Sequence, residues 1–206
     1  MATPEVDGHE PLDDMHAVSW SDGVWSTAPE AIALDGEQLL VTSRPESDMW
    51  RVTSYGFVHD DGHGLLVDLP DRSAVEVSFI ADFDQQFDQA GVLLRADERH
   101  WIKSGVEYAD GAPQVGAVVT ADVSDWSTAP FPQWHGREVT VRASRSGDAV
   151  TIRARADGPW QLVRLAPIDP ALAWKAGPFT CAPSRSGLVV RFTRFALGPA
   201  DRSLHD

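Results

Sequence analysis

Cysteine is almost absent from this chain, since Cys181 is the only one among 206 residues. A single thiol excludes an internal disulfide and argues against a disulfide-stapled secreted scaffold. We expect Cys181 to be a small buried apolar side chain. Long apolar runs are also missing, which predicts no membrane-spanning helix. Residues 1–14 carry five acids but no Lys, no Arg and no apolar run, unlike a signal or transit peptide, so we expect a cytoplasmic protein.

Basic residues are scarce as well. There are 17 Lys and Arg against 31 Asp and Glu, which gives a formal net charge of −14. The summed field repels polyanions, so neither nucleic acid nor an anionic membrane surface is expected as a partner. The sequence has no Gly-rich phosphate loop and no G-x-S-x-G nucleophile elbow. We therefore expect no cofactor, and we interpret the acidity as favouring solubility.

The segments that remain follow the pattern of short β-strands. No segment longer than ten residues keeps a helical apolar stripe, so helices should be few and short. In residues 75–83, Val75, Val77 and Phe79 alternate with polar residues, and residues 138–156 repeat this alternation around Gly147. Further strands are expected at 31–34, 38–42, 64–69, 91–96, 101–108, 115–120, 160–165, 174–181 and 188–197. This pattern predicts an all-β sandwich or jelly roll of two antiparallel sheets.

The length suits one domain with a substantial core. We place this domain at residues 15–198, between a flexible acidic arm at 1–14 and a C-terminal polar tail at 199–206. Neither end shows apolar periodicity.

Residues 101–108 have an unusual polar face. Alternation places Trp101, Lys103 and Glu107 on one side of the strand, with Gly105 between the two charges, while residues such as Ile102 point towards the core. An exposed tryptophan on a polar face suggests contact with a ligand. The alternative is a Lys103–Glu107 ion pair lying over a packed Trp101. The pattern alone leaves both interpretations open.

Two further aromatic clusters support ligand binding. One is Ser124-Asp125-Trp126-Ser127, and the other is Asp48-Met49-Trp50 ahead of Tyr55. Aromatic rings beside Asp, Gln and Ser groups can hold a polar ligand with apolar faces, such as a sugar. Other tryptophans are expected to pack in or on the core: Trp25, Trp134 and Trp160.

Several motifs occur in the order seen in a known family. They lie at 87–91, 101–107, 118–120, 124–127, 157–160, 177–179, 182–183 and 187–192. On these motifs, residues 18–197 resemble the family known as domain of unknown function 1349. That family is related to proteins described as regulators of enolase, within the concanavalin A-like lectin and glucanase superfamily. The resemblance implies a jelly roll of two antiparallel sheets, whose concave face holds ligand in related lectins and glucanases. Fold alone does not imply a reaction.

Two other patterns are weaker. Glu5-Val6-Asp7-Gly8-His9-Glu10 has the loose spacing of the glucanase acids of that superfamily, but it lies in the acidic arm without the flanking alternation of a strand. His59-Asp60-Asp61-Gly62-His63 could supply metal ligands, yet we interpret it as a hairpin tip with no third ligand group nearby. No metal site is expected.

Three hypotheses follow. In the first, a carbohydrate or similar polar ligand binds the concave sheet face. In the second, the chain is a sugar-active enzyme, with Glu107 as general acid or base and Lys103 tuning its pKa. In the third, the same patch is a protein-interaction module, on a monomer or homodimer. The residues expected to touch a ligand are Trp50, Tyr55, Asp88, Gln89, Trp101, Lys103, Glu107 and Trp126.

Overall fold

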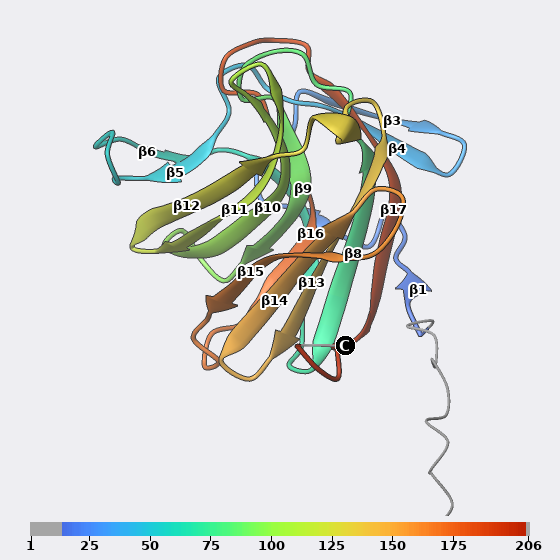
Figure 1. Cartoon of the computed structure of the whole chain (residues 1–206), viewed down its shortest axis with the longest axis vertical. Coiled ribbons are helices and arrows are strands. Elements are labelled where there is room, and N and C mark those ends of the chain that lie inside the picture. Colours follow the sequence, from blue (N-terminus) through green and yellow to red (C-terminus); the bar gives the residue numbers. More distant parts are fainter. Residues whose placement is uncertain (1–13, 205–206) are drawn as a thin grey trace, which may run out of the picture.

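The computed structural model describes residues 14–204, and they form two large antiparallel sheets packed face to face (Figure 1). One sheet has the strand order β15-β14-β13-β8-β17-β4-β3, with β1 paired to β17; the other has the order β12-β11-β10-β9-β16-β7-β2. A separate hairpin consists of β5 and β6. The predicted all-β sandwich is thereby confirmed.

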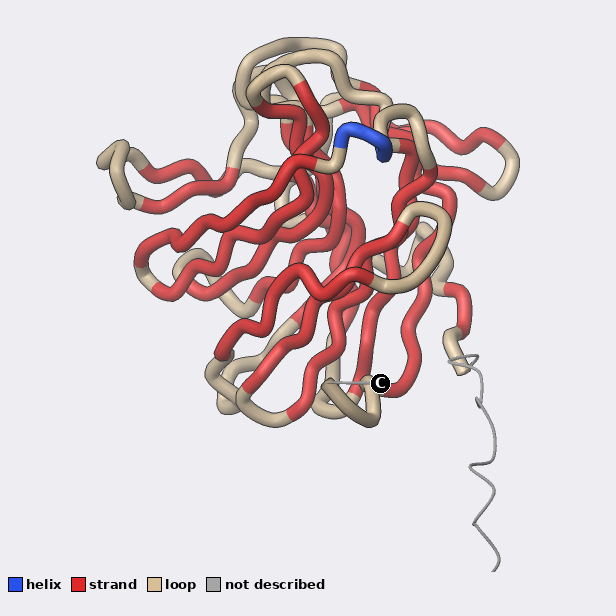
Figure 2. The backbone as a smooth tube through the Cα atoms, viewed as in Figure 1, coloured by secondary structure: helices blue, strands red, loops and turns tan. Residues whose placement is uncertain are grey.

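The strands are short and follow one another closely along the chain. Their bounds are β1 His16–Ala17, β2 Val24–Trp25, β3 Ala31–Asp35, β4 Gln38–Thr42, β5 Met49–Arg51, β6 Val58–Asp60, β7 His63–Asp68, β8 Ser73–Ile80, β9 Gln89–Arg95, β10 His100–Ala109, β11 Ala112–Ala121, β12 Val123–Pro130, β13 Glu138–Ser146, β14 Ala149–Arg155, β15 Gln161–Pro167, β16 Lys175–Cys181 and β17 Val189–Pro199. Residues 14–204 contain a single 3-10 turn, Pro132–Trp134, as helix (Figure 2). No helix within those residues could cross a membrane.

The core fills the space between the two sheets. Alternation along β8 places Val75, Val77 and Phe79 in this core, each fully buried. On β10 the same rule sends Ile102 and Val106 into the core, as the sequence pattern predicts. The opposite face of β10 therefore points away from the eight-stranded sheet.

A second, smaller apolar cluster lies on that opposite face of the seven-stranded sheet. It consists of Met49, Trp50, Leu66, Leu93, Trp101, Val118, Phe179 and Cys181. The β5–β6 hairpin supplies Met49 and Trp50, so this hairpin packs over the sheet and covers part of its outer face. Cys181 is buried here, as expected for a small apolar side chain.

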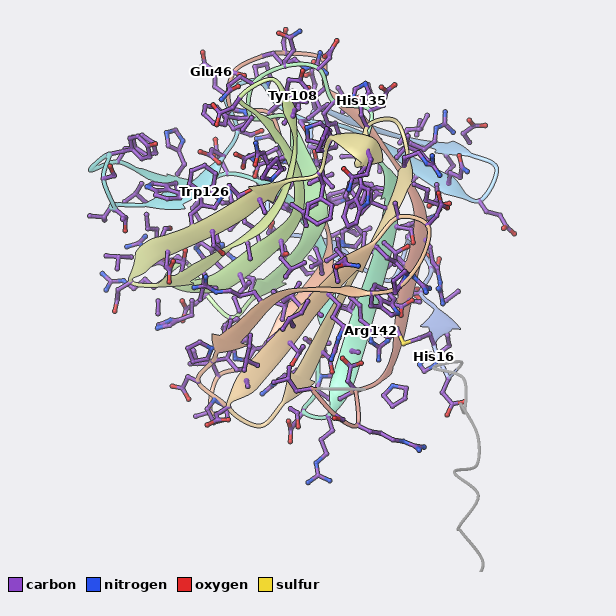
Figure 3. All side chains as sticks on the ribbon, viewed as in Figure 1. His16, Glu46, Tyr108, Trp126, His135 and Arg142 are labelled. Carbon is purple, nitrogen blue, oxygen red and sulfur yellow. The ribbon has the colours of Figure 1, made fainter. Side chains whose placement is uncertain are left out.

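The C-terminal segment docks on the outer face of the eight-stranded sheet. Arg142 on β13 donates to the Asp201 carboxylate from Nε at 2.7 Å and to the Pro199 carbonyl at 2.9 Å, and it forms an ion pair with Glu76 on β8 (Figure 3). This coverage explains why Glu76 is buried although it lies on the polar side of β8. Of the predicted terminal segments, residues 1–13 and 205–206 lie outside the described residues.

Candidate functional site

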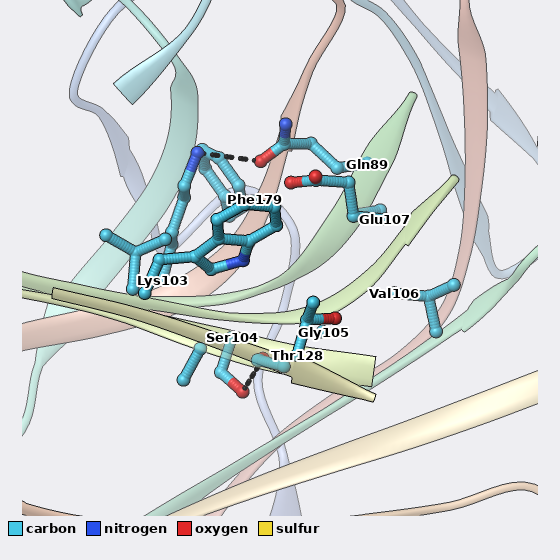
Figure 4. A pocket seen from close by; sticks show the side chains of 13 residues that line it. Gln89, Lys103, Ser104, Gly105, Val106, Glu107, Thr128 and Phe179 are labelled. Atoms are coloured by element: carbon cyan, nitrogen blue, oxygen red, sulfur yellow. Dashed lines mark hydrogen bonds between the residues drawn. The ribbon is translucent and has the colours of Figure 1, made fainter. Parts of the chain in front are cut away.

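A hollow of about 260 Å³ opens on the outer face of the seven-stranded sheet, beside the β5–β6 hairpin. Six of the residues expected to touch a ligand line it: Trp50, Tyr55, Gln89, Lys103, Glu107 and Trp126. These residues come from the β5–β6 hairpin and from strands β9, β10 and β12. A narrower cleft shares Gln89, Lys103, Glu107 and Trp126 with the hollow and continues over the sheet (Figure 4).

A row of glycines forms part of the sheet beneath this cleft. Gly105 on β10 pairs with Gly91 on β9 and with Gly116 on β11. A Cβ on Gly105 would lie 2.7 Å from the Gly91 Cα and would overlap the Ala90 carbonyl oxygen. The three strands approach one another so closely that no side chain fits at this row. The absence of side chains there leaves space above the sheet between Lys103 and Glu107.

Aromatic rings make up the walls of the hollow. On the hairpin, Tyr55 stacks on Phe57 with ring centroids 5.4 Å apart and meets Trp50 edge-on at 5.6 Å. Trp126 belongs to β12 and lies on the side of that strand towards the hairpin (Figure 3). Phe87, from the loop before β9, also lines the hollow. Apart from Trp50, these rings keep 38–62% of their surface exposed.

The loop end of the hairpin is held against the neighbouring β11–β12 turn. Within the loop, the Val52 amide donates to the Phe57 carbonyl at 2.8 Å, and Val52 takes a positive φ of 64° that a β-branched residue rarely adopts. Just before the loop, the Arg51 amide donates to Ser124 Oγ at 2.9 Å, and the Arg51 side chain donates to the Asp122 carbonyl at 3.1 Å. The hairpin is therefore tied to the β11–β12 turn, which places it beside Trp126.

Lys103 is almost completely buried at the bottom of the hollow, with 6% of its surface exposed. Its ammonium donates to the Gln89 side-chain carbonyl at 2.9 Å and to Asp48 Oδ1 at 3.2 Å. Burial by itself lowers the pKa of Lys103, but Asp48 and the other acidic groups nearby, Glu107 among them, together outweigh burial, so the pKa lies above its usual value. Lys103 is a charged, fixed donor whose positive charge Asp48 balances.

Glu107 is the least satisfied polar group at the site. Its carboxylate lines both the hollow and the cleft, beside Gln89 (Figure 4), yet it forms no hydrogen bond or ion pair within residues 14–204. Burial raises the pKa of Glu107 to about 7, although the charge of Lys103 acts in the opposite direction. Near neutral pH both the protonated and the ionised form of this carboxyl group are therefore populated.

Two of the expected ligand contacts are wrong. Trp101 is fully buried in the smaller apolar cluster, because the β5–β6 hairpin and neighbouring apolar side chains cover its end of β10. Asp88 is also fully buried, since Arg185 Nε lies 2.9 Å from its Oδ1 and the Gln85 amide donates to its Oδ2. Neither side chain lines the hollow.

The alternative interpretation, a Lys103–Glu107 ion pair over a packed Trp101, is correct for Trp101 and wrong for the ion pair. Trp101 is packed as that interpretation requires, but Lys103 pairs with Asp48 and not with Glu107. Sequence reasoning missed several lining residues: Asp48, Phe57, Phe87, Val118 and Pro183. Asp48 stands in the Asp48-Met49-Trp50 motif and could have been included. Nothing in the sequence points to Phe57 or Pro183.

The segment 59–63 is not the hairpin tip that the sequence predicts. Asp61 and Gly62 connect β6 to β7, which belong to different sheets. His63 is buried, its Nδ1 lies 3.2 Å from the Thr27 carbonyl, and its Nε2 accepts the Arg44 amide at 3.0 Å. Burial lowers the pKa of His63, which keeps the ring neutral. Residues 14–204 contain no cluster of three metal ligands, and Glu5–Glu10 lies outside the described residues.

Replacing Glu107 with glutamine is expected to raise the free energy of unfolding at about pH 8 by roughly 2 kcal/mol and to change it little at about pH 4. The pKa of Glu107 is about 7 in the folded protein against an ordinary value of 4.5, so the unfolded chain binds fewer protons between these values. Stability of the natural protein therefore falls as pH rises through this window, and Glu107→Gln removes that fall.

Urea unfolding of both proteins between about pH 4 and 8 measures the difference. Glu30→Gln is the matched control, because Glu30 is exposed next to β3 and should change stability by less than about 0.5 kcal/mol at every pH. A Glu107→Gln difference that is independent of pH would contradict the raised pKa.

Two large antiparallel sheets packed face to face give this chain the fold of a concanavalin A-like jelly-roll sandwich. The chain belongs to the family described as protein of unknown function (DUF1349), which matches residues 25–200.

Comparison with individual proteins agrees with this assignment. The chain is 34% identical over 188 residues to regulation of enolase protein 1 of Saccharomyces cerevisiae, covering 90% of this chain and 94% of that protein. A crystal structure of a functionally unknown protein from Saccharomyces cerevisiae superposes with a TM-score of 0.83 at 32% identity, over 89% of this chain and all of the other. Xylan β-1,4-xylosidase from Bacillus halodurans superposes with a TM-score of 0.66 at 16% identity, over 95% of this chain and 41% of that enzyme. This last likeness shows a shared fold only.

Proposed function

We propose that the chain binds a carbohydrate, or a similar polar ligand with an apolar ring face, in the hollow between β12 and the β5–β6 hairpin. The observation that carries this proposal is the combination of exposed aromatic walls and a charged base within one hollow. Trp126 and Tyr55 keep 42% and 62% of their surfaces exposed at its rim, while Lys103 and Glu107 lie at its base. Large exposed rings gathered at one place usually mark an interaction site.

The chemistry of the site suits a sugar. A pyranose ring has an apolar face that stacks on an aromatic ring, and its hydroxyl groups need donors and acceptors. Lys103 uses two of its three N–H groups on Gln89 and Asp48, which leaves one donor for a ligand. Glu107, without a partner of its own, can accept from a hydroxyl group. The volume of about 260 Å³ suits one or two sugar units.

A second candidate function is hydrolysis or another acid–base reaction on such a ligand. The supporting observation is that burial raises the pKa of Glu107 to about 7, where a carboxyl group can both donate and accept a proton near neutral pH. In this hypothesis Glu107 acts on the ligand and Lys103, held by Asp48, keeps its charge beside it.

Calorimetric titration with neutral oligosaccharides, including xylo-, cello- and chito-oligosaccharides, tests binding. We expect at least one to bind, and Trp126→Ala to weaken that binding about tenfold or more. Trp160→Ala is the matched control, because Trp160 lies between β14 and β15, where Arg155 packs on its ring at 4.2 Å, and does not line the hollow. It should leave the affinity unchanged.

The same mixtures, analysed for cleaved sugar after long incubation, separate the two candidate functions. Cleavage that disappears in Glu107→Gln would establish catalysis, whereas bound but intact sugar would support binding alone. If no oligosaccharide of a broad panel binds, or if Trp126→Ala binds as well as the natural protein, the proposed site is wrong.

A further inference from the structure

The charges at the base of the hollow do not cancel. The ammonium of Lys103 is balanced by the Asp48 carboxylate 3.2 Å away, and the ring of Phe179 lies 5.9 Å from the same ammonium. Glu107 has no such counterpart, because it forms no ion pair within the described chain. When Glu107 is ionised, the three groups together carry one negative charge that faces the hollow. A half-buried carboxylate without a partner is costly, so a cationic group of a ligand would be stabilised there.

The walls of the hollow also favour a cationic ligand. Trp126, Tyr55, Phe57 and Phe87 present aromatic rings, whose faces carry partial negative charge and attract cations. The whole chain has a net charge of −14, which draws small cations towards it and repels anions. An anionic ligand would have to compete with Asp48 for Lys103, the one cationic side chain that lines the hollow.

We propose that the ligand of this hollow carries a cationic amino group, as an amino sugar does, and that Glu107 is its counter-ion. The ammonium would lie against the Glu107 carboxylate while the ring faces of the walls contact the rest of the ligand. This inference rests on the proposed sugar binding and names the class of sugar.

Few charged groups face Glu107 from the elements packed around it. Lys103 lies on the same strand, Asp48 precedes β5, and Cys181 lies on β16 opposite Gln89. Burial raises the pKa of Cys181 well above its usual value, so it remains a neutral thiol. Glu107 is therefore the group that changes charge near neutral pH, and binding of a permanent cation should strengthen as pH rises through about 7.

Matched oligosaccharides of one length test this inference. The probes are an oligomer of N-acetylglucosamine, which is neutral, its deacetylated glucosamine oligomer, and the trimethylammonium form, which is charged at every pH. By calorimetry we expect the trimethylammonium oligomer to bind roughly tenfold more tightly than the neutral one at about pH 7.5. The glucosamine oligomer, whose amines lose much of their charge near that pH, should lie between them. The preference for the trimethylammonium form should increase between about pH 6 and 8 as Glu107 ionises.

Glu107→Gln should bring the ratio of cationic to neutral affinity close to one. Glu30→Gln, which removes the same charge at an exposed place outside the hollow, should keep the ratio of the natural protein. This control separates a local counter-ion from the general attraction of a −14 chain. A preference that persists unchanged in Glu107→Gln would overturn the role of Glu107.

The outcomes also distinguish this inference from the proposed function. Equal affinity for the neutral and cationic oligomers, with both weakened by Trp126→Ala, would overturn the cationic ligand and leave sugar binding standing. Failure of all oligosaccharides to bind would overturn both.

Discussion

Replacing Gly105 with alanine is expected to lower the free energy of unfolding by about 2–3 kcal/mol. Gly105 pairs with Gly91 and Gly116 in the middle of the seven-stranded sheet. The added Cβ would lie 2.7 Å from the Gly91 Cα and overlap the Ala90 carbonyl oxygen. Neither neighbour is a flexible side-chain end, so β9 and β10 would have to separate. Urea unfolding measures the loss.

Gly111→Ala provides the control for this variant. Gly111 is in the β10–β11 turn, where a Cβ would meet nothing within 4 Å, but its φ is +79°. Alanine there should cost only about 1 kcal/mol, through backbone strain alone. If Gly105→Ala costs no more than Gly111→Ala, the strands have room for a side chain and the close approach at the glycine row is wrong.

Replacing Arg142 with methionine should lower the free energy of unfolding by about 3 kcal/mol. Arg142 is buried on the outer face of the eight-stranded sheet, where it contacts Glu76, Asp201 and the Pro199 carbonyl. Methionine fills similar space but leaves these acceptors with fewer donors. Arg194 still pairs with Glu76 and Arg153 with Asp201, which limits the loss. The docked C-terminal segment should exchange its amide hydrogens faster.

Arg99→Met is the matched control, since it removes an ion pair of the same type at an exposed place. Arg99 pairs with Asp122 at 2.7 Å, with more than half of each side chain exposed. The expected loss is below about 1 kcal/mol. Equal losses in the two variants would show that the buried ion pairs of Arg142 contribute no more than a surface pair.

The polar face of β10 was predictable from alternation alone. Side chains on a strand point to opposite faces in turn, so Lys103 and Glu107 had to share a face opposite Ile102 and Val106. The structure confirms both assignments. Alternation says which face a residue occupies but not what covers that face. Trp101 shares the face of Lys103, yet it is buried because the β5–β6 hairpin packs over that end of the strand.

The elements that complete the hollow were harder to predict. Strand β5 has three residues, too few to show a period, and its hairpin follows no alternating pattern. Strand β12 was not among the expected strands, because Val123–Pro130 is an edge strand with mostly exposed residues. This segment becomes a strand because it pairs with β11, where Trp126 lies opposite Val118, although its own sequence does not signal a strand. The sequence shows the aromatic motifs around Trp50 and Trp126, but it does not show that the two motifs lie beside the same hollow.

The amino-acid sequence by itself determined the class of fold and the faces of its long strands, because these follow from local periodicity, turn residues and composition. It also determined that no internal disulfide forms. Only the tertiary structure decided which polar residues meet. Lys103 pairs with Asp48, 55 residues away along the chain, and Glu107 is left without a partner. Such pairings depend on how a hairpin packs on a sheet, and contacts between distant segments leave no periodic pattern in either one.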